Sequence, residues 1–224
     1  MNLVSIELAR VLQLFNADEI KPRKGFYPPE FRRMVGERYR FATLPDIEKK
    51  IEGGLKFGFG QFVTGERTIN IADLTVYNDG VAVEATNSDD ADIVLTEFIE
   101  WIKENLGINE PTTIIPRSYI SGVVVDFDAP IDHAWSLFQA FAEIATDIYG
   151  AVYNVTPKFA LSRIGLTATD RGTPAIINPE LIIERRGNIS LPSKTNRHYC
   201  SAALPSDFLI ELMSRFEKIA LSSK

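Results

Sequence analysis

The clearest structural signals in the chain lie in INIADLTVYNDGVAVEATNSDDADIVLTEFIEWIKENLG, residues 69–107. It begins with two β-branched, apolar runs, 69–77 and 81–85, on either side of Asn78-Asp79-Gly80. These three residue types tolerate the positive φ angles of a tight turn, so the pattern predicts an antiparallel hairpin. An amphipathic segment follows, with Asn87 and several aspartates at its start and Gly107 at its end. Asn favours the N-cap, carboxylates favour the first turn and Gly favours the C-terminal stop, so we predict a helix here.

Three more segments space their apolar residues as a helix does. One follows Pro28-Pro29, the second follows Asp128 with Pro130 in its first turn, and the third follows Pro205. Proline suits an opening turn because its missing N–H has no partner there in any helix. We therefore expect four helices.

Several other segments have the composition of strands. The first segment, 4–15, is ambiguous, because Leu8 and Leu12 fit both strand alternation and helical spacing. We choose a strand because that choice makes the order of elements repeat along the chain. The remaining expected strands are Leu55–Val63, Tyr119–Phe127, Phe159–Thr167, Leu181–Arg185 and His198–Ala203.

The expected elements fall into two halves of the same order, β-α-β-β-β-α. Each half has a strand followed by a proline-started helix, and each closes with a short strand and an amphipathic helix that carries aspartate near its start. The predicted fold class is α+β: a tandem duplication with antiparallel sheet and helices packed on one face. The first half is residues 1–110 and the second is residues 117–224, and together they form one pseudo-duplicated globular unit.

This layout is similar to the duplicated saddle of the TATA-binding protein family, although no shared motif carries the likeness. The chain also resembles uncharacterised bacterial proteins of its size in the Tyr77-Asn78-Asp79-Gly80 turn and the Glu184-Arg185-Arg186 run. Fold likeness does not transfer function. These resemblances therefore imply an arrangement and a bacterial origin, but no activity.

Composition excludes several classes of protein. A hydrophobic content of 45% is typical of a chain with a buried core, and no apolar run approaches the roughly 18 residues of a membrane helix. A single cysteine fits a reducing cytoplasm, which is the expected location. The net charge of −6 gives no general attraction to nucleic acid. It is uneven, however, because residues 21–40 hold seven basic and two acidic side chains, while residues 41–110 hold five and fourteen.

The sequence contains no phosphate-binding loop, zinc-protease motif or nucleophile elbow. His198 and Cys200 lie two residues apart on an expected strand, where they share a face, but a lone cysteine is usually a small buried apolar residue. Asp126 and Asp128 are too few for a hard-cation site. We therefore expect no cofactor, no metal and no catalytic residue.

The basic residues are the candidate site for an anion or a partner. Arginine guanidinium groups beside aromatic rings can bind phosphate and unstacked bases, but the same arginines can pair with the acidic residues of 41–110. The first cluster of candidates is Arg23, Lys24, Tyr27, Arg32 and Arg33. The second cluster lies around a predicted hairpin and consists of Arg185, Arg186, Lys194, Arg197, His198 and Tyr199.

Three functions remain open on these grounds. The leading hypothesis is a non-enzymatic module that binds another protein, as a subunit of a larger bacterial system. The second is nucleic-acid binding through a curved sheet and the basic hairpins. The third is an enzyme with a site between the halves that uses Arg185, His198 and Asp126. The sequence does not give an oligomeric state.

Overall fold

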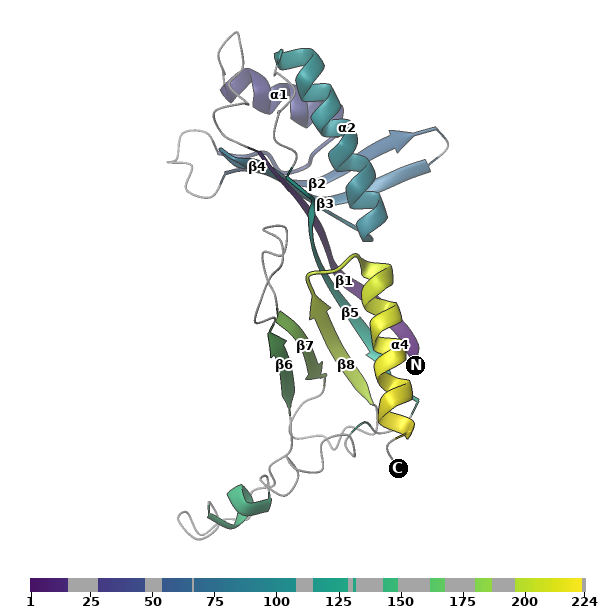
Figure 1. The fold of residues 1–224 in the computed structure, drawn as a ribbon. Helices are drawn as coiled ribbons and strands as arrows, with labels where there is room; N and C mark the ends of the chain where they lie inside the picture. Colours follow the sequence, from purple (N-terminus) through teal and green to yellow (C-terminus); the bar gives the residue numbers. More distant parts are fainter. Residues whose placement is uncertain are drawn as a thin grey trace.

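A single antiparallel sheet of eight strands forms the centre of the molecule, in the order β2-β3-β4-β1-β5-β8-β7-β6. Figure 1 shows this sheet with its helices in a computed structural model of the chain. The structure describes residues 1–15, 28–46, 54–65, 67–107, 115–128, 131, 143–148, 162–167, 180–186 and 196–222. The chain is α+β, as the sequence predicts.

Eleven labelled elements follow one another along the chain. The first six are β1 (Asn2–Leu14), α1 (Pro28–Arg38), β2 (Leu55–Thr64), β3 (Arg67–Val76), β4 (Gly80–Ala85) and α2 (Ser88–Leu106). The others are β5 (Ser118–Asp126), β6 (Arg163–Thr167), β7 (Glu180–Arg185), β8 (Arg197–Ala202) and α4 (Ser206–Ser222). Residues 143–148 form a further helical segment, and most of the third predicted helix lies outside the described residues.

Residues 69–107 fold as their sequence predicts. β3 and β4 pair across the turn at residues 77–80, where the amide of Tyr77 donates to the carbonyl of Gly80 at 2.8 Å. Asn87 caps α2 by accepting from the amide of Asp90, and Gly107 ends the helix at φ 63°, a left-handed angle that glycine adopts without strain. The first segment is a strand, which confirms the choice made from the order of elements.

β1 and β5 join the two parts of the sheet. They pair antiparallel from Asn2 opposite Asp126 to Leu12 opposite Ser118, with irregular register near Ser5 and Leu8. β1 also pairs with β4, and β5 with β8. The sheet is therefore continuous through both of the expected halves.

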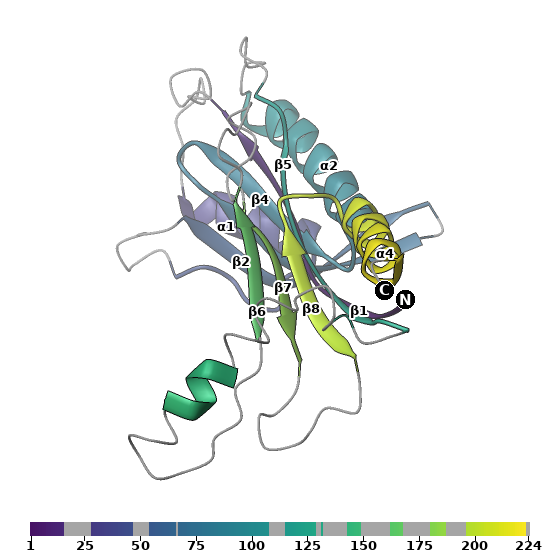
Figure 2. The ribbon, with the colours of Figure 1, turned by 60° about the horizontal axis from the view of Figure 1, so that its bottom comes forward.

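The helices α1, α2 and α4 cover one face of the sheet. α2 contacts β1, β3 and β4, and α4 contacts β1, β5 and β8. Figures 1 and 2 show α2 and α4 following one another along the sheet. On β1 the buried Ala9 and Val11 point to this face, so alternation places Leu8, Arg10, Leu12 and Leu14 on the other. We call that other side, which no described helix covers, the open face.

The helix-covered face holds two hydrophobic clusters. The larger one packs Phe31 of α1 and Phe98 of α2 over Phe57 of β2, with the Phe31 ring edge-on to both at 6.3 and 6.5 Å between centroids. The smaller one lies between α4 and β5, β7 and β8, and it includes Cys200 and Met213. Edge-to-face rings and fully buried aliphatic side chains make the helix-covered face the main source of stability.

Two serines join α2 to α4 at their first residues. The amide of Ser206 donates to Oγ of Ser88 at 2.9 Å, and the amide of Ser88 donates to Oγ of Ser206 at 3.2 Å. The two hydroxyl oxygens are also 2.9 Å apart. Both serines are buried, so each satisfies a helix N-terminal N–H that water does not reach.

Candidate functional site

The described basic residues of the first cluster are engaged with their own surroundings. Nε of Arg32 donates to the carbonyl of Pro45 at 2.8 Å. Arg33 pairs with Glu30 and Glu37, one turn away on each side of it in α1. The other predicted members of this cluster, Arg23, Lys24 and Tyr27, lie outside the described residues.

The second basic cluster is divided between the two faces of the sheet. Arg185 and His198 are register partners on β7 and β8, and His198 lies on the helix-covered face, where its ring packs 5.2 Å from that of Phe127. Because side chains alternate along a strand, Arg197 and Tyr199 point to the open face. Arg186 belongs with them, since its guanidinium lies 5.0 Å from the centre of the Tyr199 ring. Lys194 lies outside the described residues.

The arginines on the open face are paired with carboxylates. Arg197 holds both carboxylate oxygens of Asp126, each at 2.8 Å, and this hydrogen bonding lowers the pKa of Asp126. Arg186 pairs with Glu7 of β1. A paired arginine offers less attraction to a polyanion than the sequence count alone indicates.

His198 and Cys200 share a face, as predicted, but they do not form an activated nucleophile. Cys200 is fully buried, and burial raises the pKa of its thiol to about 12. Nδ1 of His198 lies 2.9 Å from the carbonyl oxygen of Asn196. The thiolate is the reactive form of cysteine, so a thiol of this pKa is a packing residue.

The three residues of the enzyme hypothesis do not point into one site. Arg185 and His198 lie on the helix-covered face, whereas Asp126 pairs with Arg197 on the open face. The sheet itself separates the carboxylate from the other two side chains.

The aspartates of α2 serve the fold. Asp90 pairs with Arg67 of β3, and Asp92 accepts from Arg117 at 2.5 Å and from the Tyr119 hydroxyl at 2.8 Å. Hydrogen bonding to Asp92 and burial raise the pKa of Tyr119 to about 12, with burial the larger cause. Within the described part of the chain, no three His, Cys, Asp or Glu side chains are placed to hold a metal ion.

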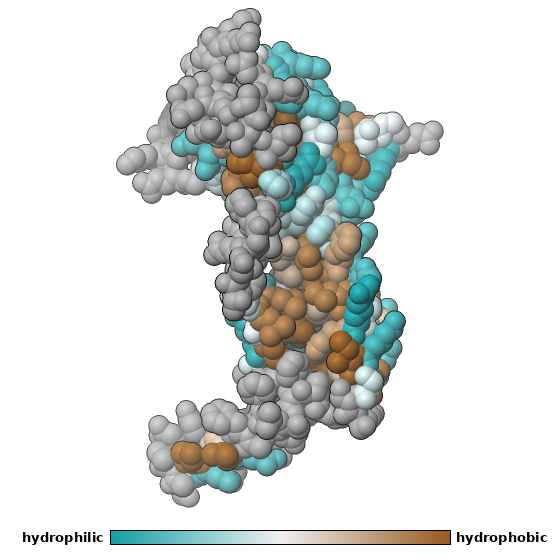
Figure 3. Space-filling view, in the orientation of Figure 1, coloured by the Kyte–Doolittle hydropathy of each residue, from teal (hydrophilic) through white to brown (hydrophobic). Residues whose placement is uncertain are grey.

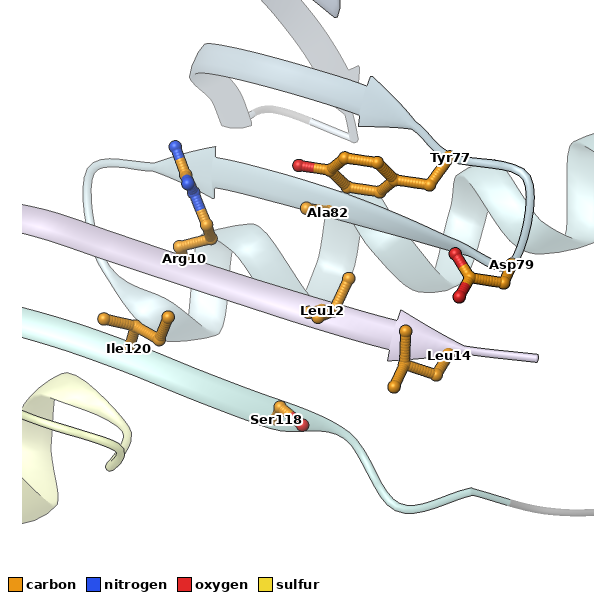
Figure 4. A pocket seen from close by; sticks show the side chains of 8 residues that line it. All are labelled: Arg10, Leu12, Leu14, Tyr77, Asp79, Ala82, Ser118 and Ile120. Carbon is orange, nitrogen blue, oxygen red and sulfur yellow. The ribbon is translucent and has the colours of Figure 1, made fainter. Parts of the chain in front are cut away.

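A pocket of about 270 Å³ lies on the open face, where β1, β4 and β5 run side by side. Figure 4 shows the ring of Tyr77 along one side, with its hydroxyl directed toward Arg10, and the carboxylate of Asp79 at the far end. Its wall is mostly apolar. The lining residues are Arg10, Leu12, Leu14, Tyr77, Asp79, Ala82, Ser118 and Ile120.

Arg10 closes one end of this pocket within a small ion network. Its Nη2 lies 2.6 Å from Glu84 and 3.3 Å from Asp73, and Lys56 lies 3.1 Å from Asp73. Burial by itself lowers the pKa of Arg10, but Asp73 and Glu84 outweigh it, so the pKa is raised and the guanidinium stays charged. Two basic and two acidic groups make this end of the pocket neutral.

One donor of Arg10 has no acceptor in this network. Its Nε is buried and has no hydrogen-bond partner among the described residues. An unmade hydrogen bond at a buried donor costs about 1–3 kcal/mol, so this N–H lowers the stability of the fold.

Sequence reasoning missed this pocket. Alternation along residues 4–15 gives Leu8, Leu12 and Leu14 a common face, and Arg10 interrupts them. That interruption is the available signal, because a charged side chain in an apolar stripe needs partners. The partners come from β3 and β4, more than 60 residues later in the chain, at separations of 63 and 74 residues.

Comparison with known proteins assigns no family to the chain. No protein-family model matches it, and no curated protein matches it. Among the residues that the structure describes, no helix combines the length and the apolar character needed to cross a membrane.

Proposed function

We propose that this chain is a protein-interaction module of the bacterial cytoplasm, and that its partner docks on the open face. The observation that carries the proposal is the pocket of Arg10, Leu12 and Tyr77 on a sheet face that no described helix covers. Leu12, Leu14 and Ile120 are half-buried there, so a partner would remove further apolar surface from water.

The size of the pocket favours a polypeptide over a small molecule. Sites for drug-sized ligands and cofactors span roughly 300–1,000 Å³. At about 270 Å³ this pocket falls just below that range and suits one large apolar side chain. We infer that such a side chain of the partner packs on Leu12, Ala82 and Ile120.

The polar groups at the two ends suit a peptide backbone. The end at Arg10 is neutral, because Arg10 and Lys56 balance Asp73 and Glu84, and it therefore suits an uncharged peptide group better than a carboxylate. Asp79 at the other end accepts hydrogen bonds from an amide or an ammonium group. The anchor side chain is therefore expected to have an uncharged peptide group on one side and a hydrogen-bond donor on the other.

The first test is site-specific photocrosslinking in the native host. A photoreactive amino acid at Tyr77, which is 36% exposed, is compared with one at Ile93 of α2, which is 38% exposed on the other side of the molecule. One protein should be captured from position 77 and not from position 93. Equal capture at both positions would contradict a partner on the open face.

The second test uses the purified partner. Leu12→Lys should weaken binding by about tenfold or more, because a central apolar contact is replaced by a charge. A lysine at a half-buried position can reach solvent with its ammonium group, so the variant should keep its unfolding midpoint. Unchanged binding by a folded Leu12→Lys protein would rule out the pocket as the anchor site.

We also infer that the chain is a tandem duplication of a β-α-β-β-β-α unit, with a layout similar to that of the TATA-binding protein family. Support comes from the strand order, which runs outward from the centre as β1-β4-β3-β2 on one side and β5-β8-β7-β6 on the other. Reciprocal bonding between the first residues of α2 and α4 supports it as well. The combined effect of Ser88→Ala and Ser206→Ala on the free energy of unfolding tests this reciprocity.

A further inference from the structure

The two serines that join α2 to α4 give a direct alignment of these helices. Ser88 and Ser206 are each the first residue of their helix, and they are 118 residues apart. Residue n of α2 therefore occupies the same place on its helix as residue n + 118 of α4. The burial of corresponding side chains can then be compared one by one.

Corresponding apolar side chains on the two helices differ in exposure. Val94 and Phe98 of α2 are fully buried, and Trp101 is 8% exposed. The counterpart of Trp101 is Ile219, which is 65% exposed. We call the three counterparts on α4, which are Leu212, Phe216 and Ile219, the α4 stripe. Figure 3 shows apolar side chains gathered over the β7–β8 part of the sheet, up to the edge of α4.

Helix α1 covers this stripe on α2. The ring of Phe31 packs edge-on against Phe98, and the guanidinium of Arg38 lies 5.4 Å from the centre of the Trp101 ring. Arg38 also pairs with Glu97. α1 thus presents an apolar face to α2 together with one charge opposite in sign to that of the facing helix.

The charge at the corresponding place on α4 is reversed. The counterpart of Glu97 is Arg215, whose side chain is largely exposed and pairs with Glu211 one turn away. A helix that covered α4 as α1 covers α2 would therefore need a carboxylate where α1 has Arg38. Such complementarity selects the occupant by the sign of its charge.

The helical segment at 143–148 has both features that such a helix would need, an apolar face and a carboxylate. It lies between β5 and β6 in the chain, as α1 lies between β1 and β2. Ile144 and Ile148 are 54% and 57% exposed and one helical turn apart, and Asp147 directly precedes Ile148 as Arg38 precedes Tyr39. Figure 2 shows this segment standing apart from the sheet.

The segment carries two exposed apolar side chains on one face. Most helical stability in proteins comes from packing of an apolar face. Ile144 and Ile148 therefore need an apolar surface, and the α4 stripe offers one. Sixteen residues separate the segment from β5 and fourteen separate it from β6, and connections that reach about 45–50 Å or more when extended do not prevent the contact.

We infer that the helix at 143–148 docks on the α4 stripe of its own chain, with Ile144 and Ile148 against Phe216 and Ile219 and Asp147 paired with Arg215. It takes the place on α4 that α1 takes on α2. The contact covers the α4 stripe on the helix-covered face of the second half and leaves the open face unchanged. It is therefore independent of the proposed partner site at Arg10.

Disulfide trapping in the full chain tests the contact. Ile148→Cys with Ile219→Cys should form an intramolecular disulfide under mild oxidation, seen as a compact monomer on a non-reducing gel. The control pair is Ile148→Cys with Ile93→Cys, which places the second thiol on the exposed side of α2 and should not crosslink. The native Cys200 is fully buried and stays out of the reaction.

The outcomes separate the possible occupants. A disulfide between two chains would mean that a second copy covers the stripe, and it would overturn the inference. Equal crosslinking of the test and control pairs, or none in either, would overturn it as well. Photocrosslinking from Tyr77 reports on the partner site separately, so failure of one proposal is distinguishable from failure of the other.

Charge reversal provides a second measurement, in which the crosslinking rate of the 148–219 cysteine pair reports on the ion pair between Asp147 and Arg215. Asp147→Arg in the 148–219 cysteine background should slow crosslinking by roughly two- to fivefold, the range of an exposed ion pair. Adding Arg215→Asp should restore the rate. If the double reversal is as slow as the single one, Asp147 does not face Arg215.

Discussion

The bonding of Ser88 and Ser206 across the α2–α4 junction makes a quantitative prediction about stability. Each hydroxyl accepts from the other serine's amide, and the two hydroxyls share a third hydrogen bond. Ser88→Ala removes two of the three bonds, and Ser206→Ala also removes two. With a net value of about 1 kcal/mol for each bond, and more where a buried N–H is left unpaired, each single substitution should cost about 2–4 kcal/mol.

The double variant makes the prediction specific. It loses three bonds in all, not four, because both single variants lose the same hydroxyl–hydroxyl bond. The double variant should therefore be more stable than the sum of the two single effects implies, by about 1 kcal/mol. Urea unfolding at constant m-value measures each free energy.

Ser121 of β5 is the matched control. It is fully buried like the two serines, but its hydroxyl has no hydrogen-bond partner among the described residues. Ser121→Ala should leave the free energy of unfolding unchanged or raise it, because it removes an unsatisfied polar group. Strictly additive effects of Ser88→Ala and Ser206→Ala on the free energy of unfolding, or an equal loss of stability in Ser121→Ala, would refute the reciprocal hydrogen bonding of the two serines.

Three further predictions follow from local chemistry. The pKa of Asp126 is lowered by Arg197, so this pair stabilises the fold above the ordinary carboxylate pKa and loses its effect as pH falls through the lowered value. In Arg197→Ala that pKa should rise toward normal in an NMR titration; an unmoved titration would contradict the pairing. Cys200, with a pKa of about 12, should react with a thiol reagent only after unfolding, and fast labelling of the native protein would show otherwise. Phe59 has φ 55° and an exposed ring, so Phe59→Gly should raise the free energy of unfolding by about 1 kcal/mol, and a loss of stability would show that its ring packs.

Local sequence patterns were sufficient to predict the β3–β4 hairpin and helix α2. Asn78-Asp79-Gly80 predicted the turn between β3 and β4, and Asn87 and Gly107 predicted both ends of α2. These signals work because turns and caps depend on the φ angles and hydrogen bonds of adjacent residues. The ambiguous first segment needed the order of elements as well, since its apolar spacing fits two periods.

The candidate site was less accessible to sequence reasoning. The count of basic residues near 185–199 suggested one patch, but alternation divides it between two faces of the sheet. Arg197 and Arg186 also find carboxylates that are 71 and 179 residues away. A charge count cannot include such partners, because strand register and not distance along the chain brings them together.

Periods of two and 3.6 residues in the sequence predicted most of the described strands and helices, and they predicted which side chains of an element share a face. Tertiary structure alone decided that Arg10 meets Glu84 and Asp73, and that β1, β4 and β5 enclose a pocket beside it. It also decided that α1 covers the stripe on α2, while Ile219 in the matching stripe on α4 is exposed. The physical reason is that long-range contacts depend on strand pairing and helix docking, which are set by the free energy of the whole fold.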